Sequence, residues 1–203
     1  MKAGVTATVT GNANIEGGGN TALYVKGALA LEDDSTLQLT DLTSNRHNAY
    51  LNGQLSVGNS PGTATINGGD FAMTPNASFA VEIAGLTPGS QHDQLIITGA
   101  GSDIALAGTL TLDVTGAVAA SVGDLIFIIS NEAGTTTGLF QYAQGAYVDT
   151  FYGKKWAISY SADLAGNAFL GGNDVALMAI PEPASAVVLG LTGLLALRRR
   201  ARA

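Results

Sequence analysis

The sequence predicts an all-β protein, and within that class it favours a parallel β-solenoid. Three observations support this: the chain has few charged residues, apolar and polar residues alternate in many short segments, and a glycine-based pattern recurs. Only 12% of the 203 residues are charged, while 27 are glycine. Helices prefer Lys, Glu, Arg and Gln on their solvent-facing sides, so this composition favours strands and turns. The length suits one folded domain.

Half-buried strands are predicted wherever apolar and polar residues alternate with a period of two. Such alternation places Leu, Val and Ile on one face of a sheet and Thr, Ser, Gln or Glu on the other. The segments that show it are 27–32, 35–40, 53–58, 62–67, 77–84 and 108–114. Turn-forming residues such as Asn, Asp, Gly and Pro separate them.

A glycine followed by two alternating apolar residues recurs along the chain. The copies are Gly27-Leu29-Leu31, Gly53-Leu55-Val57, Gly62-Ala64-Ile66 and Gly108-Leu110-Leu112. The interval between the second and fourth copies is close to twice that between the first and second. A regular spacing of this length is typical of a solenoid, in which each rung covers the apolar edge of the next. We expect the glycines at corners that need a positive φ.

The second half of the body, from about residue 84 to 180, is bulkier. Segments 93–99 and 123–130 are nearly continuous apolar runs, which are typical of strands covered on both faces, and most of the large aromatic residues follow. This region is predicted to cap the solenoid, whose last rung would otherwise expose its edge. A β-sandwich is the alternative, because short strands separated by closely spaced turns also fit that fold.

Residues 55–99 carry a family resemblance. The turn "GNSPGT" at 58–63, the strand "VEIAG" at 81–85 and "DQL" at 93–95 occur in this order. The stretch resembles the autotransporter-associated, passenger-type β-strand repeats of bacterial surface proteins, and the likeness extends over about residues 27–180. It implies a right-handed parallel β-helix on an exported protein.

The carboxyl-terminal segment 181–203 differs from the body. Pro181-Glu182-Pro183 comes first, an apolar stretch covers 184–197, and the end holds Arg198, Arg199, Arg200 and Arg202. Two prolines around a glutamate favour an extended conformation that a processing enzyme can reach. The apolar stretch would form a short transmembrane helix of about 21 Å, against a hydrocarbon core of about 30 Å. The arginines would stay on the cytoplasmic side.

This tail resembles the PEP-CTERM sorting signal of Gram-negative bacteria. The resemblance implies that an exosortase in the inner membrane recognises Pro181, Glu182 and Pro183 and removes the tail during export. It also implies a protein of the cell surface or of an extracellular polysaccharide or biofilm matrix. The expected organisation is therefore an ectodomain at 1–180 and a sorting signal at 181–203. Residues 1–19 lack the apolar run of a signal peptide, so we expect that a leader is missing from the front.

Charge narrows the range of partners. Four of the nine basic residues lie in the last six positions, which leaves the preceding 197 residues five basic residues against all sixteen acidic ones, a net charge of −11. Such a body repels phosphate backbones, so no nucleic-acid partner is expected. The chain has no cysteine, which excludes disulfides and thiolate metal sites.

No catalytic site, metal or cofactor is expected. His47 and His92 lie in turn-like segments without partner spacing and are predicted to be solvated loop residues. A polysaccharide lyase or hydrolase is an alternative that rests on analogy of fold alone. A calcium site is a second alternative, with fragments of a glycine–aspartate motif at 16–20 and 171–174 and an acidic pair at Asp33-Asp34.

The expected function is that of an exported, non-enzymatic surface or matrix protein. The alternative is a lectin-like carbohydrate-binding module, for which aromatic side chains would have to face a ligand. Trp156, Tyr152 and Tyr160 are the candidates, although a role in the core of the cap is favoured for this aromatic group.

Overall fold

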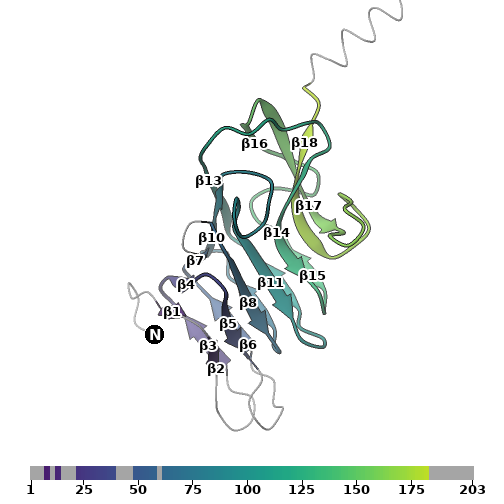
Figure 1. The fold of residues 1–203 in the computed structure, drawn as a ribbon. Coiled ribbons are helices and arrows are strands. Elements are labelled where there is room, and N and C mark those ends of the chain that lie inside the picture. The colour runs from purple at the N-terminus through teal and green to yellow at the C-terminus, as the bar shows by residue number, and fades with distance from the viewer. Residues whose placement is uncertain (1–6, 10–11, 15–21, 40–47, 59–60, 183–203) are drawn as a thin grey trace, which may run out of the picture.

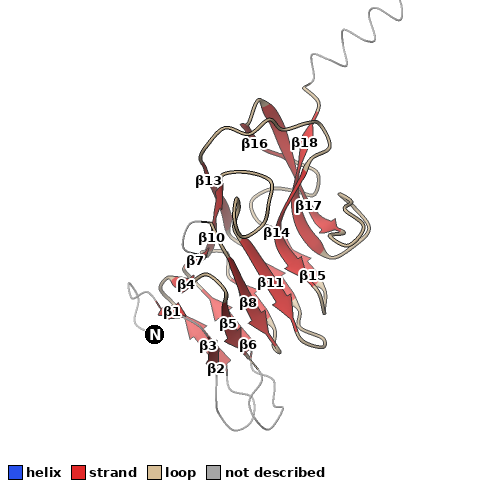
Figure 2. Cartoon of the chain, viewed as in Figure 1, coloured by secondary structure: helices blue, strands red, loops and turns tan. Residues whose placement is uncertain are grey.

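The computed structural model describes residues 7–9, 12–14, 22–39, 48–58 and 61–182. Within these residues the regular secondary structure consists of strands alone (Figures 1 and 2). The all-β class predicted from the composition and from the alternating segments is therefore confirmed.

The strands of the described residues are short in the first half of the chain and longer in the second. They are β1 (Ala7–Val9), β2 (Asn12–Asn14), β3 (Ala22–Val25), β4 (Leu29–Leu31), β5 (Ser35–Gln38), β6 (Asn48–Leu51), β7 (Gln54–Val57), β8 (Thr63–Asn67), β9 (Phe71–Met73), β10 (Ser78–Ile83), β11 (Gln94–Thr98), β12 (Ile104–Leu106), β13 (Thr109–Val114), β14 (Leu125–Asn131), β15 (Thr136–Gly138), β16 (Tyr147–Phe151), β17 (Lys154–Ala162) and β18 (Asp174–Ile180).

Every third strand of β1 to β15 joins the same parallel sheet. Sheet A has the order β1-β4-β7-β10-β13, and sheet C has the order β15-β12-β9-β6-β3. Sheet B contains β2, β5, β8, β11 and β14 and continues into β18, β17 and β16. We call three consecutive strands, one in each sheet, a rung. The chain thus passes repeatedly through the same three sheets (Figure 1), which is compatible with the predicted solenoid.

The register between rungs explains the glycine pattern. Leu29 lies beside Leu55, and Leu55 lies beside Phe79, which in turn lies beside Leu110. These pairings reproduce both intervals read from the sequence, although the length of single rungs varies along this column. The copy at Gly62 differs from the others, because its strand β8 belongs to sheet B. Short apolar patterns thus recur in more than one sheet.

Alternation along each strand separates the interior from the surface. In β10, Phe79, Val81 and Ile83 are buried, while the residues between them are partly exposed. The same pattern holds in β4, β5, β7, β8, β9 and β12. Burying each large aliphatic side chain contributes about 1.5–3 kcal/mol, so the stacked interior columns hold the rungs together.

The last parallel rung is closed by an antiparallel unit. Strand β18 pairs with β14, β17 with β18, and β16 with β17, all antiparallel. Phe140 packs between Phe79 and Tyr160, with ring centroids 6.2 and 6.1 Å apart. The side chain of Gln141 accepts a hydrogen bond from the amide of Leu110 and donates one to its carbonyl, and so satisfies the edge of β13 as a strand would.

The capping unit begins later than the sequence suggested. Parallel pairing continues through β15, which ends at Gly138, and antiparallel pairing starts at β16. The apolar runs at 93–99 and 123–130 belong to β11 and β14 in the parallel part of sheet B. An apolar run indicates that a strand is buried, but not whether it pairs in a parallel or an antiparallel way. The size of the side chains therefore led to a predicted start of the cap at about residue 84.

Carboxylates connect the corners of successive rungs. The Asp33 carboxylate accepts a hydrogen bond from the amide of Thr63 at 3.0 Å, and Asp103 accepts one from the amide of Thr135 at 2.7 Å. Each bond joins residues about one rung apart in the chain. Amides at the corners cannot join the sheet ladders, so these side chains satisfy donors that would otherwise lack partners.

Gly53 is required by close packing between rungs rather than by a left-handed backbone. A Cβ atom at this position would lie 1.9 Å from the carbonyl oxygen of Gly27 in the preceding rung. Gly108 has a φ of +80°, and a Cβ atom there would also lie 2.0 Å from the carbonyl oxygen of Ala77. The predicted positive φ at the repeat glycines therefore holds at Gly108 but not at Gly53 or Gly62. At Gly53 the close approach of two backbones leaves no room for a side chain.

We predict that Gly53→Ala destabilises the protein by more than a substitution that only strains φ. The control is Gly145→Ala, where φ is +74° and no atom lies within 4 Å of the added Cβ. That control should cost about 1–2 kcal/mol. Urea unfolding of both variants measures the difference, and an equal or smaller loss for Gly53→Ala would contradict the close approach of the rungs.

Candidate binding groove on sheet A

A groove with a volume of about 360 Å³ lies on sheet A over β7, β10 and β13. Its polar lining consists of Gln54, Ser56, Glu82, Asp93, Thr111 and Asp113. Most of these side chains occupy outward positions of the strands, which alternate with the buried core positions. The groove is therefore formed mostly by side chains on the outer face of the sheet.

Small side chains form the middle of this outer face. Ala30 lies beside Ser56, Ser56 beside Ala80, and Ala80 beside Thr111 on successive strands. Ser56, Ala80 and Thr111 line the groove. Because the column crosses β7, β10 and β13, the depression runs across the strands and along the stack of rungs.

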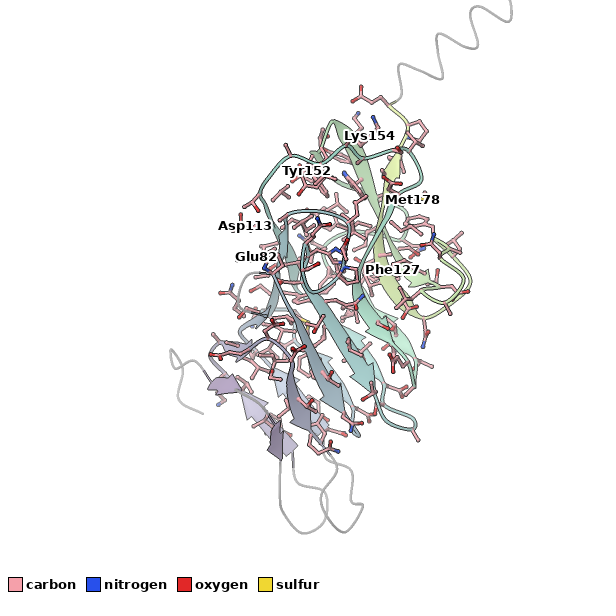
Figure 3. All side chains as sticks on the ribbon, in the orientation of Figure 1. Glu82, Asp113, Phe127, Tyr152, Lys154 and Met178 are labelled. Carbon is pink, nitrogen blue, oxygen red and sulfur yellow. The ribbon has the colours of Figure 1, made fainter. Side chains whose placement is uncertain are left out.

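Two acidic side chains lie directly opposite one another in this groove. Glu82 on β10 pairs in register with Asp113 on β13 (Figure 3). The carboxylates of Glu82 and Asp113 have no hydrogen bond or ion pair among the described residues. Like charges opposite one another on neighbouring strands are destabilising. The groove therefore holds an uncompensated concentration of negative charge.

Asp93 is a third carboxylate that lines the groove, but it is buried. Its side chain is 2% exposed, and its two oxygens accept hydrogen bonds from the amides of Gly62 and Glu82 at 2.9 and 2.8 Å. Burial raises the pKa of Asp93 to about 6, despite the opposing effect of these two bonds; the charges of Glu82 and Asp33 add to the rise. Asp93 thus fixes the corner beside the groove.

The described residues that line the groove contain no Lys, Arg or His. The lyase alternative needs a basic residue to abstract a proton, and none is provided by this lining. Within the described part of the chain, no three His, Cys, Asp or Glu side chains are grouped so as to hold a metal ion. The arrangement is suited to accepting hydrogen bonds and positive charge.

His92 is buried, and the prediction of a solvated loop residue was wrong. It is 1% exposed, because the loop after β10 folds back and His92 forms a bridge with Ile83. Its Nδ1 lies 3.3 Å from the Gly85 carbonyl oxygen, and its Nε2 makes no hydrogen bond of ordinary geometry, although the Phe127 carbonyl faces the ring. Burial lowers the pKa of His92. His47 lies outside the described residues.

Trp156 and Tyr160 lie in the core of the antiparallel unit. Trp156 is fully buried, its ring stacks on Phe151 at 4.7 Å, and its Nε1 donates a hydrogen bond to the Phe151 carbonyl. Tyr160 is 7% exposed and donates to the carbonyl of Tyr142; burial raises the pKa of its hydroxyl to about 12. Neither ring offers a face to a ligand on the surface.

Tyr152, the third aromatic candidate, lies nearer to the groove. Its hydroxyl is 2.9 Å from the carbonyl oxygen of Ile83 and 2.7 Å from that of Thr115, at the ends of β10 and β13. These are the strand ends that carry Glu82 and Asp113 (Figure 3). The half-buried side chain therefore ties the antiparallel unit to one end of the groove-bearing sheet.

The acidic turns proposed for calcium have structural partners. Asp33 and Asp34 are exposed in a turn, where both carboxylates accept hydrogen bonds from Thr63. Asp174 is buried and accepts bonds from the amides of Asn131 and Leu164, both at 2.7 Å. The fragment at 16–20 lies outside the described residues.

The start of the predicted sorting signal follows the last strand directly. Strand β18 ends at Ile180, and Pro181 and Glu182 are exposed and outside regular structure. Pro183, the apolar stretch at 184–197, and Arg198, Arg199, Arg200 and Arg202 lie outside the described residues, so the predicted short transmembrane helix does too. Among the residues that are described, no helix has the length and apolar character to cross a membrane.

Comparison with protein-family models, curated proteins and solved structures finds no match to this chain.

We predict that Asp93 makes the stability of the protein fall between about pH 4 and pH 7. The folded-state pKa of about 6 exceeds the ordinary value of 3.8, so the folded state binds this proton more tightly than the unfolded chain. The stabilising contribution is complete below pH 3.8 and is lost as the pH rises through 6.

Urea unfolding of the wild type and of Asp93→Asn across this range isolates the effect, because all other titrating groups are shared. The wild type should lose stability relative to Asp93→Asn as the pH rises. Asp113→Asn is the matched control and should retain the wild-type fall. A constant difference between wild type and Asp93→Asn would contradict the raised pKa.

Proposed function

We propose that this chain is an exported, non-enzymatic structural protein of the bacterial cell surface or extracellular matrix. Its body is a right-handed parallel β-helix closed by an antiparallel cap. Its last residues are a PEP-CTERM sorting signal, processed by an exosortase while a short apolar helix holds the chain in the inner membrane. After release, the body associates with extracellular polysaccharide.

The observation that carries this proposal is the exposure of Pro181 and Glu182, the first two residues of the Pro-Glu-Pro motif, directly after β18. The final strand is fully integrated in sheet B up to Ile180, and the next residues, Pro181 and Glu182, are exposed. A processing enzyme must bind its recognition motif in an extended form, and the two prolines favour that form. Cleavage beyond β18 would leave every described strand intact.

The body supports a structural rather than a catalytic role. Its parallel strands recur in the same three sheets, and the interior columns bury one continuous apolar core. Outward positions carry mostly small or polar residues, such as Ser78, Ala80 and Glu82 on β10. Such a stack presents a long hydrogen-bonding surface, and its negative charge favours solubility outside the cell.

We predict that an exosortase removes the tail. The full chain, carrying an export signal, is produced in a Gram-negative bacterium with an exosortase and in the same strain without it. The cells are fractionated, and the mass of the carboxyl-terminal peptide is measured. With the enzyme, extracellular protein should lack residues 184–203; without it, the protein should stay in the membrane fraction.

Two variants test whether the motif is recognised. Glu182→Ala should reduce the released, shortened protein at least about tenfold and raise the membrane-bound form, whereas Glu132→Ala, at another exposed glutamate, should be processed like the wild type. Extracellular protein that retains residues 184–203 in the complete strain would refute the sorting signal.

A lectin-like role is the second candidate, and the groove on sheet A is the observation that favours it. Trp156 and Tyr160 are buried, so carbohydrate binding would depend on the polar groove rather than on stacking against these rings. The β-helix lyase alternative receives less support, because the groove lining supplies carboxylates without a basic residue to abstract a proton. A hydrolase would use two carboxylates and no cation, and that alternative rests on analogy of fold alone.

A further inference from the structure

The groove has the dimensions of a small-ligand site. Its volume of about 360 Å³ falls within the range of roughly 300–1,000 Å³ that is usual for ligand pockets. It is formed by β7, β10 and β13, which are held by continuous parallel pairing and by the Asp93 corner. The site is therefore preformed on rigid strands.

We propose that this groove binds a saccharide that carries a protonated amino group, such as a glucosamine unit of a polymer. The ammonium group lies between the carboxylates of Glu82 and Asp113, and the sugar hydroxyls hydrogen-bond with Gln54, Ser56 and Thr111. This proposal deepens the proposed association with extracellular polysaccharide and rests on it.

The pair Glu82 and Asp113 selects a cationic group. The two residues are opposite in register on neighbouring strands, which lie about 4.8 Å apart in a sheet. A single ammonium group has three N–H donors and can reach both carboxylates, which removes their mutual repulsion and forms charge-assisted hydrogen bonds. No lysine or arginine is among the described residues that line the groove, so a bound ammonium group would supply the positive charge that these residues lack.

The rest of the lining selects a hydroxyl-rich ligand. Gln54 supplies an amide that donates and accepts, and Ser56 supplies a hydroxyl group that does both. The Thr111 hydroxyl donates to the Phe79 carbonyl at 3.3 Å and so offers its oxygen as an acceptor. The small Ala80 between them leaves the middle of the groove open. These groups lie on three successive strands, so an elongated saccharide can lie across the rungs. An acidic polymer such as a polyuronate is excluded by the same carboxylates.

The test is calorimetric titration of the full chain at pH 6.5 with three defined oligosaccharides: a glucosamine tetramer, its fully N-acetylated form and a uronic acid tetramer. The glucosamine tetramer should bind at least about tenfold more tightly than the N-acetylated tetramer, and the uronic acid tetramer should not bind. Glu82→Gln and Asp113→Asn should each weaken the glucosamine affinity about tenfold.

Glu132→Gln is the matched control, because it removes one exposed negative charge away from the groove and should leave the affinity unchanged. Urea unfolding of the Glu82 and Asp113 variants verifies that they fold, and relief of like-charge repulsion should leave their stability equal to or above that of the wild type. A short lysine peptide tests whether positive charge alone suffices.

Several outcomes would overturn the proposal. They are absence of glucosamine binding, equal affinity for the N-acetylated tetramer, equal weakening by Glu132→Gln, and equally tight binding of the lysine peptide. These results are independent of tail processing, so a groove that does not bind the glucosamine tetramer would not contradict the proposed sorting signal. Failure of the sorting experiment would in turn leave the binding measurement valid as a property of the body.

Discussion

The rest of the structure depends on parallel pairing between strands that are one rung apart. Backbone amides and carbonyls of a rung find most of their partners in the rungs before and after it. No rung can satisfy its hydrogen bonds or bury its apolar face alone, so the rungs stabilise one another in a row. The alternating strands, the stacked interior columns and the small residues at points of close approach are consequences of this pairing.

Parallel pairing of this kind leaves backbone amides without partners at the corners, and an uncovered apolar interior and strand edge at the ends of the stack. At the corners, Asp33 and Asp93 accept amides of a neighbouring rung. At the carboxyl-terminal end, Phe140 covers the interior and Gln141 satisfies the edge of β13. Much of the acidic and aromatic content of the chain is therefore explained by structure, and the aromatic rings that suggest a lectin in the sequence belong to this closing unit.

Glu82 and Asp113 have no such structural role. Their carboxylates lie side by side on the outer face without a partner among the described residues, where small neighbouring side chains of sheet A leave a hollow. A surface that only presents an inert structural face does not require this charge arrangement. The groove and the exposed residues Pro181 and Glu182 are the features on which the two proposals rest: binding of a ligand by the body and release of the body from the membrane.

The sequence by itself determined the all-β class, the inward and outward faces of the strands and the interval between the first rungs, because alternation and glycine spacing are local properties. The Pro-Glu-Pro tail, which the sequence predicts to be a separate segment, stays a prediction. The favoured core role of Trp156 is confirmed, but the sequence did not determine the start of the antiparallel unit, the burial of His92, or the pairing of Glu82 with Asp113. Those depend on which strands become neighbours. Glu82 and Asp113 are far apart in the sequence, and only the register of β10 against β13 brings them together.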